Sequence, residues 1–229
     1  MEAPTHELPQ PIGTGEAPWS YERAEFVADG VVHAVGVALG IAGAIILLTI
    51  EFYSAHGTDI GSVVVYLACL LSMLGFSAAY NCWPAGRRKS ILRRFDHAAI
   101  YWLIAATYTP FLLQIRHEAV AAALLLPVWL TAAAGTALKF FYPGRFERLS
   151  IALYLLLGWS GVLAYGAVAA ALRPVTLNLI AIGGIIYSAG LIFHCWNRLR
   201  FHTAIWHCFV LGAACVHYMA VLSCVTSVI

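Results

Sequence analysis

Long apolar stretches of about twenty residues are the feature that most constrains this chain. The first covers approximately residues 30–50 and contains no Asp, Glu, Lys or Arg. A helix that crosses the hydrocarbon of a bilayer needs about 20 such residues. Charged residues make up only 10% of the chain, whereas soluble domains carry about 25%. The sequence therefore predicts an all-α integral membrane protein whose solvent is lipid.

Seven such stretches predict a bundle of seven transmembrane helices over residues 21–229. Their approximate bounds are 30–50, 61–83, 96–115, 119–141, 149–172, 175–196 and 203–227. Residues 1–20 are polar and rich in proline, which predicts an N-terminal tail outside the bundle. Residues 21–29 are expected to form a short interfacial helix that runs into the first span. The strongly basic segment AGRRKSILRRF is expected to be the loop between the second and third spans.

Basic residues predict the orientation of the bundle. Ten of the thirteen Lys and Arg residues lie in the segments that join spans two and three, four and five, and six and seven. The opposite side holds only Arg116 and Arg173, while Arg23 precedes the first span. Short loops rich in Lys and Arg stay in the cytoplasm. The sequence therefore predicts a cytoplasmic N-terminus and an external C-terminus.

Small residues in the first span form a stripe at Gly36, Gly40 and Gly43. Small residues at this spacing let helices approach closely. We expect the stripe to mediate contact within the bundle, and a dimer interface is the alternative.

Polar side chains gather near the predicted cytoplasmic end of five spans. Ser77 and Asn81 end the second span, Asp96 opens the third, and His207 lies one turn into the seventh. His33, Tyr80, His97 and His194 lie at the same level. Polar groups in lipid usually face the bundle interior or a cavity. We expect a polar layer in which Asp96 has a partner such as Arg, His or a metal-bound water, or caps the third span.

Four motifs occur in order along the chain: Glu25-x-x-x-Asp29-x-x-x-His33-x-x-Gly36, Ser77-Ala-Ala-Tyr80-Asn81, Phe95-Asp96-His97-Ala-Ala-Ile100-Tyr101, and Ile205-Trp206-His207-x-Phe209-Val210 followed by His217. Together they resemble the hemolysin III family, a branch of the progestin and adiponectin receptor superfamily. The resemblance implies a zinc ion bound by three histidines and an Asp, here Asp96, that holds a metal-bound water.

Two of the three implied zinc positions have changed in this chain. Asn81 and Thr203 occupy them, and His207 keeps the third. Asn and Thr are poor zinc ligands beside imidazole, so the sequence predicts substoichiometric zinc. A shifted thiolate and imidazole site is one alternative, and a polar cluster without metal is the other. The shifted site would draw on Cys82, His194, Cys195, His202, His207 and Cys208.

The resemblance implies metal-dependent hydrolysis of a lipid amide or ester in a cytoplasm-facing polar pocket, with Ser77 and Asp96 assisting catalysis. It also implies a bacterial-type inner membrane as the location, and membrane lipid or a lipid-like ligand as the partner. The alternative is a non-enzymatic membrane sensor, a structural protein or a cytolytic pore-former. A net charge of +2 is too small to favour a nucleic-acid partner.

The orientation can be tested with a reporter fused after Ile229. Because the predicted seven spans place that residue outside the cytoplasm, alkaline phosphatase fused there should be active and a fluorescent protein that folds only in the cytoplasm should be dark. A fusion in the segment between the second and third spans should show the reverse. Cytoplasmic activity at Ile229 would show that a span was miscounted.

Overall fold

Every element that the computed structural model describes is helical. The described residues are 18–53 and 60–226, with side chains from residue 23 onward. In chain order the elements are α1 (Pro18–Tyr53), α2 (Ile60–Cys82), α3 (Arg87–Leu112), α4 (Glu118–Phe141), α5 (Glu147–Trp159), the 3₁₀ helix η1 (Ser160–Ala164), α6 (Tyr165–Ala171), α7 (Pro174–Cys195) and α8 (His202–Thr226). Residues 1–17 of the predicted tail lie outside the described residues. The predicted interfacial segment 21–29 is part of α1.

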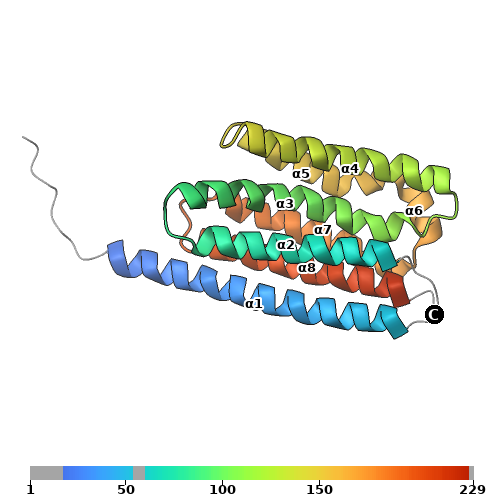
Figure 1. Ribbon diagram of the computed structural model, residues 1–229, viewed down its shortest axis with the longest axis horizontal. Coiled ribbons are helices and arrows are strands. Elements are labelled where there is room, and N and C mark those ends of the chain that lie inside the picture. The colour runs from blue at the N-terminus through green and yellow to red at the C-terminus, as the bar shows by residue number, and fades with distance from the viewer. Residues whose placement is uncertain (1–17, 54–59, 227–229) are drawn as a thin grey trace, which may run out of the picture.

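The helices lie alongside one another as rods along one long axis (Figure 1). α8 packs against α7, α1 and α3, and α3 also contacts α2, α4 and α5. Within residues 18–53 and 60–226, six helical segments are long and apolar enough to cross a membrane, with α5 to α6 counted as one. Large apolar side chains such as Ile45, Leu126 and Leu163 are exposed on the outside of the bundle. These surfaces identify an integral membrane protein, because such side chains are favoured in lipid and not in water.

The basic segment AGRRKSILRRF is helical from Arg87 onward, and the prediction of a loop there was wrong. α3 begins at Arg87 and not near residue 96. Arg and Lys are good helix formers, so α3 includes these basic residues as its first turns. Charged residues in its first three turns make α3 less apolar than the six candidate spans. The count of seven spans therefore stays a prediction.

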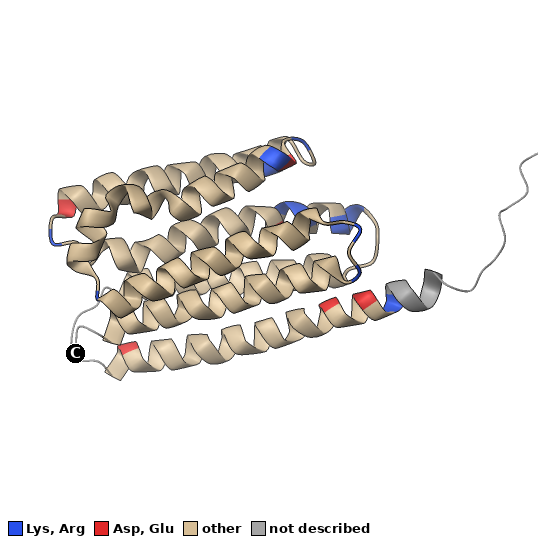
Figure 2. Ribbon diagram, turned by 180° about the vertical axis from the view of Figure 1, so that it is seen from behind, with Lys and Arg blue, Asp and Glu red and all other residues tan. Residues whose placement is uncertain are grey.

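Lys and Arg residues gather at the end of the bundle where α2 joins α3, α4 joins α5, and α7 joins α8 (Figure 2). We call this the basic end. α1 begins at the basic end, whereas α8 ends at the opposite one (Figure 1). Which side of the membrane the basic end faces stays a prediction.

The predicted fifth span is a broken helix, although the sequence predicts a continuous one. η1 interrupts it between Trp159 and Tyr165. The Tyr108 hydroxyl on α3 donates a hydrogen bond to the carbonyl of Gly158 at 2.8 Å and accepts one from the N–H of Gly161 at 2.9 Å. Unsatisfied backbone groups are costly in hydrocarbon. Tyr108 therefore stabilises a break that would otherwise leave polar backbone atoms in lipid.

The glycine stripe of α1 faces other helices of the same bundle. Gly36 and Gly40 lie against leucine side chains of α2, and Gly43 lies against the ring of Tyr218 on α8. The Tyr218 hydroxyl also donates a hydrogen bond to the carbonyl of Gly43 at 2.8 Å. The predicted contact within the bundle is therefore confirmed, and it brings α1 close to α2 and α8.

Candidate metal centre

α1 and α8 contact each other near the basic end of the bundle. Three polar side chains from these two helices lie together at this contact. Asp29 and His33 are four residues apart on α1, so they share one face of the helix. His207 comes from the second turn of α8. Asp29 is 8% exposed and His33 is 6% exposed, while the side chain of His207 is 11% exposed.

These residues form the Asp29–His33–His207 cluster. Oδ1 of Asp29 lies 2.5 Å from Nδ1 of His207, and Oδ2 lies 3.5 Å from Nε2 of His33. The centroids of the two imidazole rings are 4.4 Å apart. Each oxygen of the carboxylate therefore has a ring nitrogen beside it, which offsets the cost of burying its charge.

The composition and spacing of the cluster make it a candidate metal site. One potential ligand atom from each residue lies within 4.8 Å of the other two. Nε2 of His33 is buried and forms no hydrogen bond with the residues that the structure describes. Imidazole nitrogen and carboxylate oxygen are common ligands of zinc. A divalent ion here would give Nε2 of His33 a coordination bond in addition to its 3.5 Å ion pair with Asp29.

Ser77 and Asp96, the predicted catalytic residues, lie beside this cluster. Ser77 is near the end of α2, Asp96 is in α3, and each is 8% exposed. The Ser77 hydroxyl is a hydrogen-bond partner of the Asp96 carboxyl, which also interacts electrostatically with His207 and His33. Four helices thus contribute to one polar site at the basic end.

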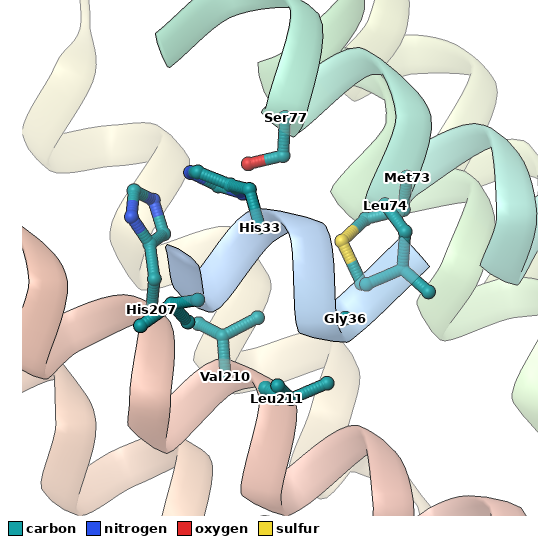
Figure 3. Close-up of a pocket in the computed structure, with 9 residues that line it drawn as sticks. His33, Gly36, Met73, Leu74, Ser77, His207, Val210 and Leu211 are labelled. Carbon is teal, nitrogen blue, oxygen red and sulfur yellow. The ribbon is translucent and has the colours of Figure 1, made fainter. Parts of the chain in front are cut away.

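A small cavity opens beside the two imidazole rings. Its volume is about 20 Å³, and its lining includes His33, Ser77, His207, Leu74 and Leu211. Figure 3 shows the Ser77 hydroxyl and both rings at one side of it, with the leucines and a methionine at the other. A cavity of about this size holds one water molecule when polar groups line it.

Asn81 and Thr203, at two of the zinc positions that the family resemblance implies, have hydrogen-bond partners within their own helices and do not join the cluster. The side-chain amide of Asn81 donates a hydrogen bond to the carbonyl of Ser77 at 2.9 Å, so it is turned back onto its own helix. The Thr203 hydroxyl lies 3.5 Å from Nε2 of His202. Of the three positions, only His207 belongs to the cluster. The family's ligand set therefore does not fit a metal in this chain.

The shifted thiolate site is not brought together either. Cys82, Cys195 and Cys208 are exposed free thiols. Among the described residues, the only group of at least three potential ligands is the Asp29–His33–His207 cluster. His194 instead packs its ring against Trp206, with ring centroids 5.0 Å apart.

His97, another histidine of the predicted polar layer, lies between two carboxylates. Nε2 of His97 lies 3.9 Å from Oδ2 of Asp96, and its Nδ1 lies 3.7 Å from Oε2 of Glu147. The Tyr80 ring packs edge-on against His97. His97 therefore connects the polar site to α5.

Sequence reasoning did not identify Asp29 and His33 as candidate ligands. The available signal was their four-residue spacing, which predicts one shared helix face. Asp29 and His207 are 178 positions apart, and spacing along one helix does not show which helix lies opposite. Glu25 also contacts a residue that is distant in the sequence. Its carboxylate accepts a hydrogen bond from the N–H of Phe201 at 2.9 Å. That bond ties α1 to the start of α8.

A helical bundle with six candidate spans among its described residues, together with a buried carboxylate–imidazole cluster, defines an integral membrane protein with a polar site at one end. The model of the family described as Haemolysin-III related matches residues 23–218. This chain belongs to that family, as its four motifs predict.

Relatives match over most of the chain. It is 36% identical to a Hemolysin-3 homolog of Bacillus subtilis, over 86% of this chain and 93% of the relative. It is 35% identical to Hemolysin-3 of Bacillus cereus, over 86% and 90%. Human monocyte to macrophage differentiation factor is 34% identical over 58% of each chain. No solved structure gave a significant match.

The position of Asp96 predicts a role in stability. Asp96→Ala removes the partner of Ser77 and a negative charge beside two histidines. We expect it to lower the free energy of unfolding by roughly a few kcal/mol, the scale for breaking a buried polar network. A thermal-shift assay in detergent measures the effect. Glu118→Ala, at the exposed start of α4, is the control, and an equal shift for both variants would show that Asp96 is dispensable.

Proposed function

We propose that this protein is a membrane-embedded hydrolase that cleaves an amide or ester bond of a membrane lipid, with zinc held by Asp29, His33 and His207. The observation that carries the proposal is the placement of three potential ligand atoms within 4.8 Å of one another, beside Ser77 and Asp96. The Bacillus relatives favour the plasma membrane of a bacterial cell as its location.

The ligand set favours a catalytic zinc ion over a structural one. Catalytic sites use about three protein ligands, typically histidines with a carboxylate, and leave a position for water, whereas structural sites use about four. The cluster supplies two imidazoles and one carboxylate. The adjoining cavity of about 20 Å³ has room for one water molecule.

The residues around the cluster have distinct roles in this proposal. A zinc ion bound there supplies Lewis-acid activation of a water molecule at neutral pH. Asp96 is the proposed proton acceptor, because its carboxyl interacts electrostatically with both histidines and with the Ser77 hydroxyl. Asp29 contacts both imidazole rings and so keeps the three proposed ligands together.

The surroundings of the cavity favour a lipid substrate. Leu74, Val210 and Leu211 line it, and the helices around it present apolar side chains outward. An acyl chain suits this environment better than a charged soluble molecule, because burying apolar surface is favourable and burying an unpaired charge is costly. The cavity itself has room for a water molecule only, so in this proposal the acyl chain lies along the apolar helix surfaces outside it.

Zinc content tests the proposed ligands. Because the structure supplies two ligands that the family positions lack, we now expect close to one zinc per chain in protein purified without chelators, measured by plasma mass spectrometry. His33→Ala and Asp29→Ala should each lower the content severalfold, since about three protein ligands are needed.

His202→Ala is the matched control, because His202 lies at the start of α8 but outside the cluster. It should retain zinc. A wild-type protein that contains little zinc, or one that loses its zinc on Cys82→Ser, would contradict the proposed ligand set.

Hydrolysis is tested with the full chain in nanodiscs made from a total bacterial lipid extract. Released fatty acids and lyso-lipids are followed by liquid chromatography and mass spectrometry. The zinc-loaded protein should form product, and Asp96→Asn should lower the rate at least about tenfold, in the range for loss of a general base, while zinc is retained. Glu118→Gln should be as active as the wild type. Full zinc occupancy without product would overturn the hydrolase and leave a metal-binding sensor.

A further inference from the structure

A second and larger cavity lies at the basic end, between α3 and the turn that joins α4 to α5. Its volume is about 270 Å³, and its lining includes Ser90, Arg93, Arg94, His97, Lys139 and Glu147. Gly144 lies in the turn with a φ of 76°, a left-handed conformation that glycine adopts readily. This turn brings the start of α5 against the basic turns of α3. The cavity shares no lining residue with the Asp29–His33–His207 cluster.

Positive charge is in excess around this cavity. Its lining contains three cationic side chains, from Arg93, Arg94 and Lys139, against the single carboxylate of Glu147. Nζ of Lys139 lies 2.8 Å from Oε2 of Glu147, and Nη2 of Arg93 lies 3.2 Å from Oε1. One carboxylate cannot neutralise three cations. Lys139 is only 3% exposed, so water compensates little of its charge, and incompletely compensated buried charge is costly.

Arg94 has unused hydrogen-bonding capacity. Its Nη1 donates a hydrogen bond of 3.4 Å to the carbonyl of Phe140. Its Nε is buried and has no hydrogen-bond partner within the described ranges. The guanidinium group is a planar fork of donors that matches the oxygens of phosphate. Because Arg94 lines the cavity, an oxyanion there would accept hydrogen bonds from the guanidinium donors that face it, and it would also offset the excess positive charge.

Exposed aromatic side chains surround the same turn. Phe141 is 77% exposed, Phe146 50% and Tyr142 49%. Aromatic residues are enriched where the hydrocarbon of a membrane meets its headgroups. A soluble anion would leave these rings uncovered, whereas the acyl chains of a phospholipid would cover them. The ligand that fits both the charge and the rings is an anionic phospholipid.

We propose that this cavity binds the phosphate group of an anionic phospholipid, with Arg94 and Arg93 as its principal contacts. Lys139 supplies a buried positive charge, and Ser90 supplies a hydroxyl donor. Basic pockets between transmembrane helices bind anionic headgroups in this way. No bond is broken at this site, and its occupancy does not depend on zinc or on hydrolysis.

The test measures lipid binding to the full chain after delipidation in detergent, by native mass spectrometry. The probes are dioleoylphosphatidylglycerol, dioleoylphosphatidylcholine and inorganic phosphate. The phosphatidylglycerol should bind most tightly, and Arg94→Gln should weaken its binding about tenfold, the scale for one charge-assisted interaction. Glu147→Gln should strengthen it, because the competing carboxylate charge is removed. Chelation of zinc should leave the affinity unchanged.

Arg88→Gln is the matched control, since Arg88 is an exposed residue of α3 that does not line the cavity. Equal weakening by Arg88→Gln and Arg94→Gln would show only general surface attraction and overturn the site. Arg94-dependent binding of inorganic phosphate, without binding of phosphatidylglycerol, would overturn the phospholipid as ligand. Thermal shift checks folding, and Arg93→Gln, whose side chain is 45% exposed, repeats the test if Arg94→Gln is unstable.

Discussion

A buried carboxylate needs compensating partners, and this requirement organises the site. Asp29 lies among apolar helices where a solitary charge would cost several kcal/mol. It meets this requirement with two imidazoles, one from its own helix and one from α8. The same interaction therefore joins the first helix of the bundle to the last and assembles a set of potential metal ligands.

Other features of the basic end follow from this junction. Glu25 fixes the start of α8 against α1, and the glycine stripe of α1 lets α2 and α8 approach closely. α2 and α3 then bring Ser77 and Asp96 beside the histidines. Because α3 continues outward as a basic helix, its arginines lie beyond the polar site, where they line the second cavity. One end of the bundle thus combines a buried polar site with a basic cavity.

Sequence patterns predicted much of the architecture, since lipid dictates the length and composition of each span. The bounds expected for the second, fourth, sixth and seventh spans agree with α2, α4, α7 and α8 within one residue. The sequence predictions were wrong where the local composition is compatible with more than one structure. The basic residues from Arg87 onward are compatible with a loop or a helix, and Tyr108 stabilises a break in the fifth span that depends on contact between helices. The Asp29–His207 contact depends on which helices are neighbours, and the sequence alone did not show that. Motifs pointed to the right end of the bundle, but of the implied ligand positions only His207 belongs to the cluster, in which the structure also places Asp29 and His33.

The most direct test of the proposed site is X-ray absorption at the zinc edge on the purified, zinc-loaded protein. A site made of Asp29, His33 and His207 predicts only nitrogen and oxygen neighbours at about 2.0–2.2 Å, together with the outer-shell scattering of two imidazoles. A sulfur neighbour at about 2.3 Å would place the ion on cysteine and contradict the account.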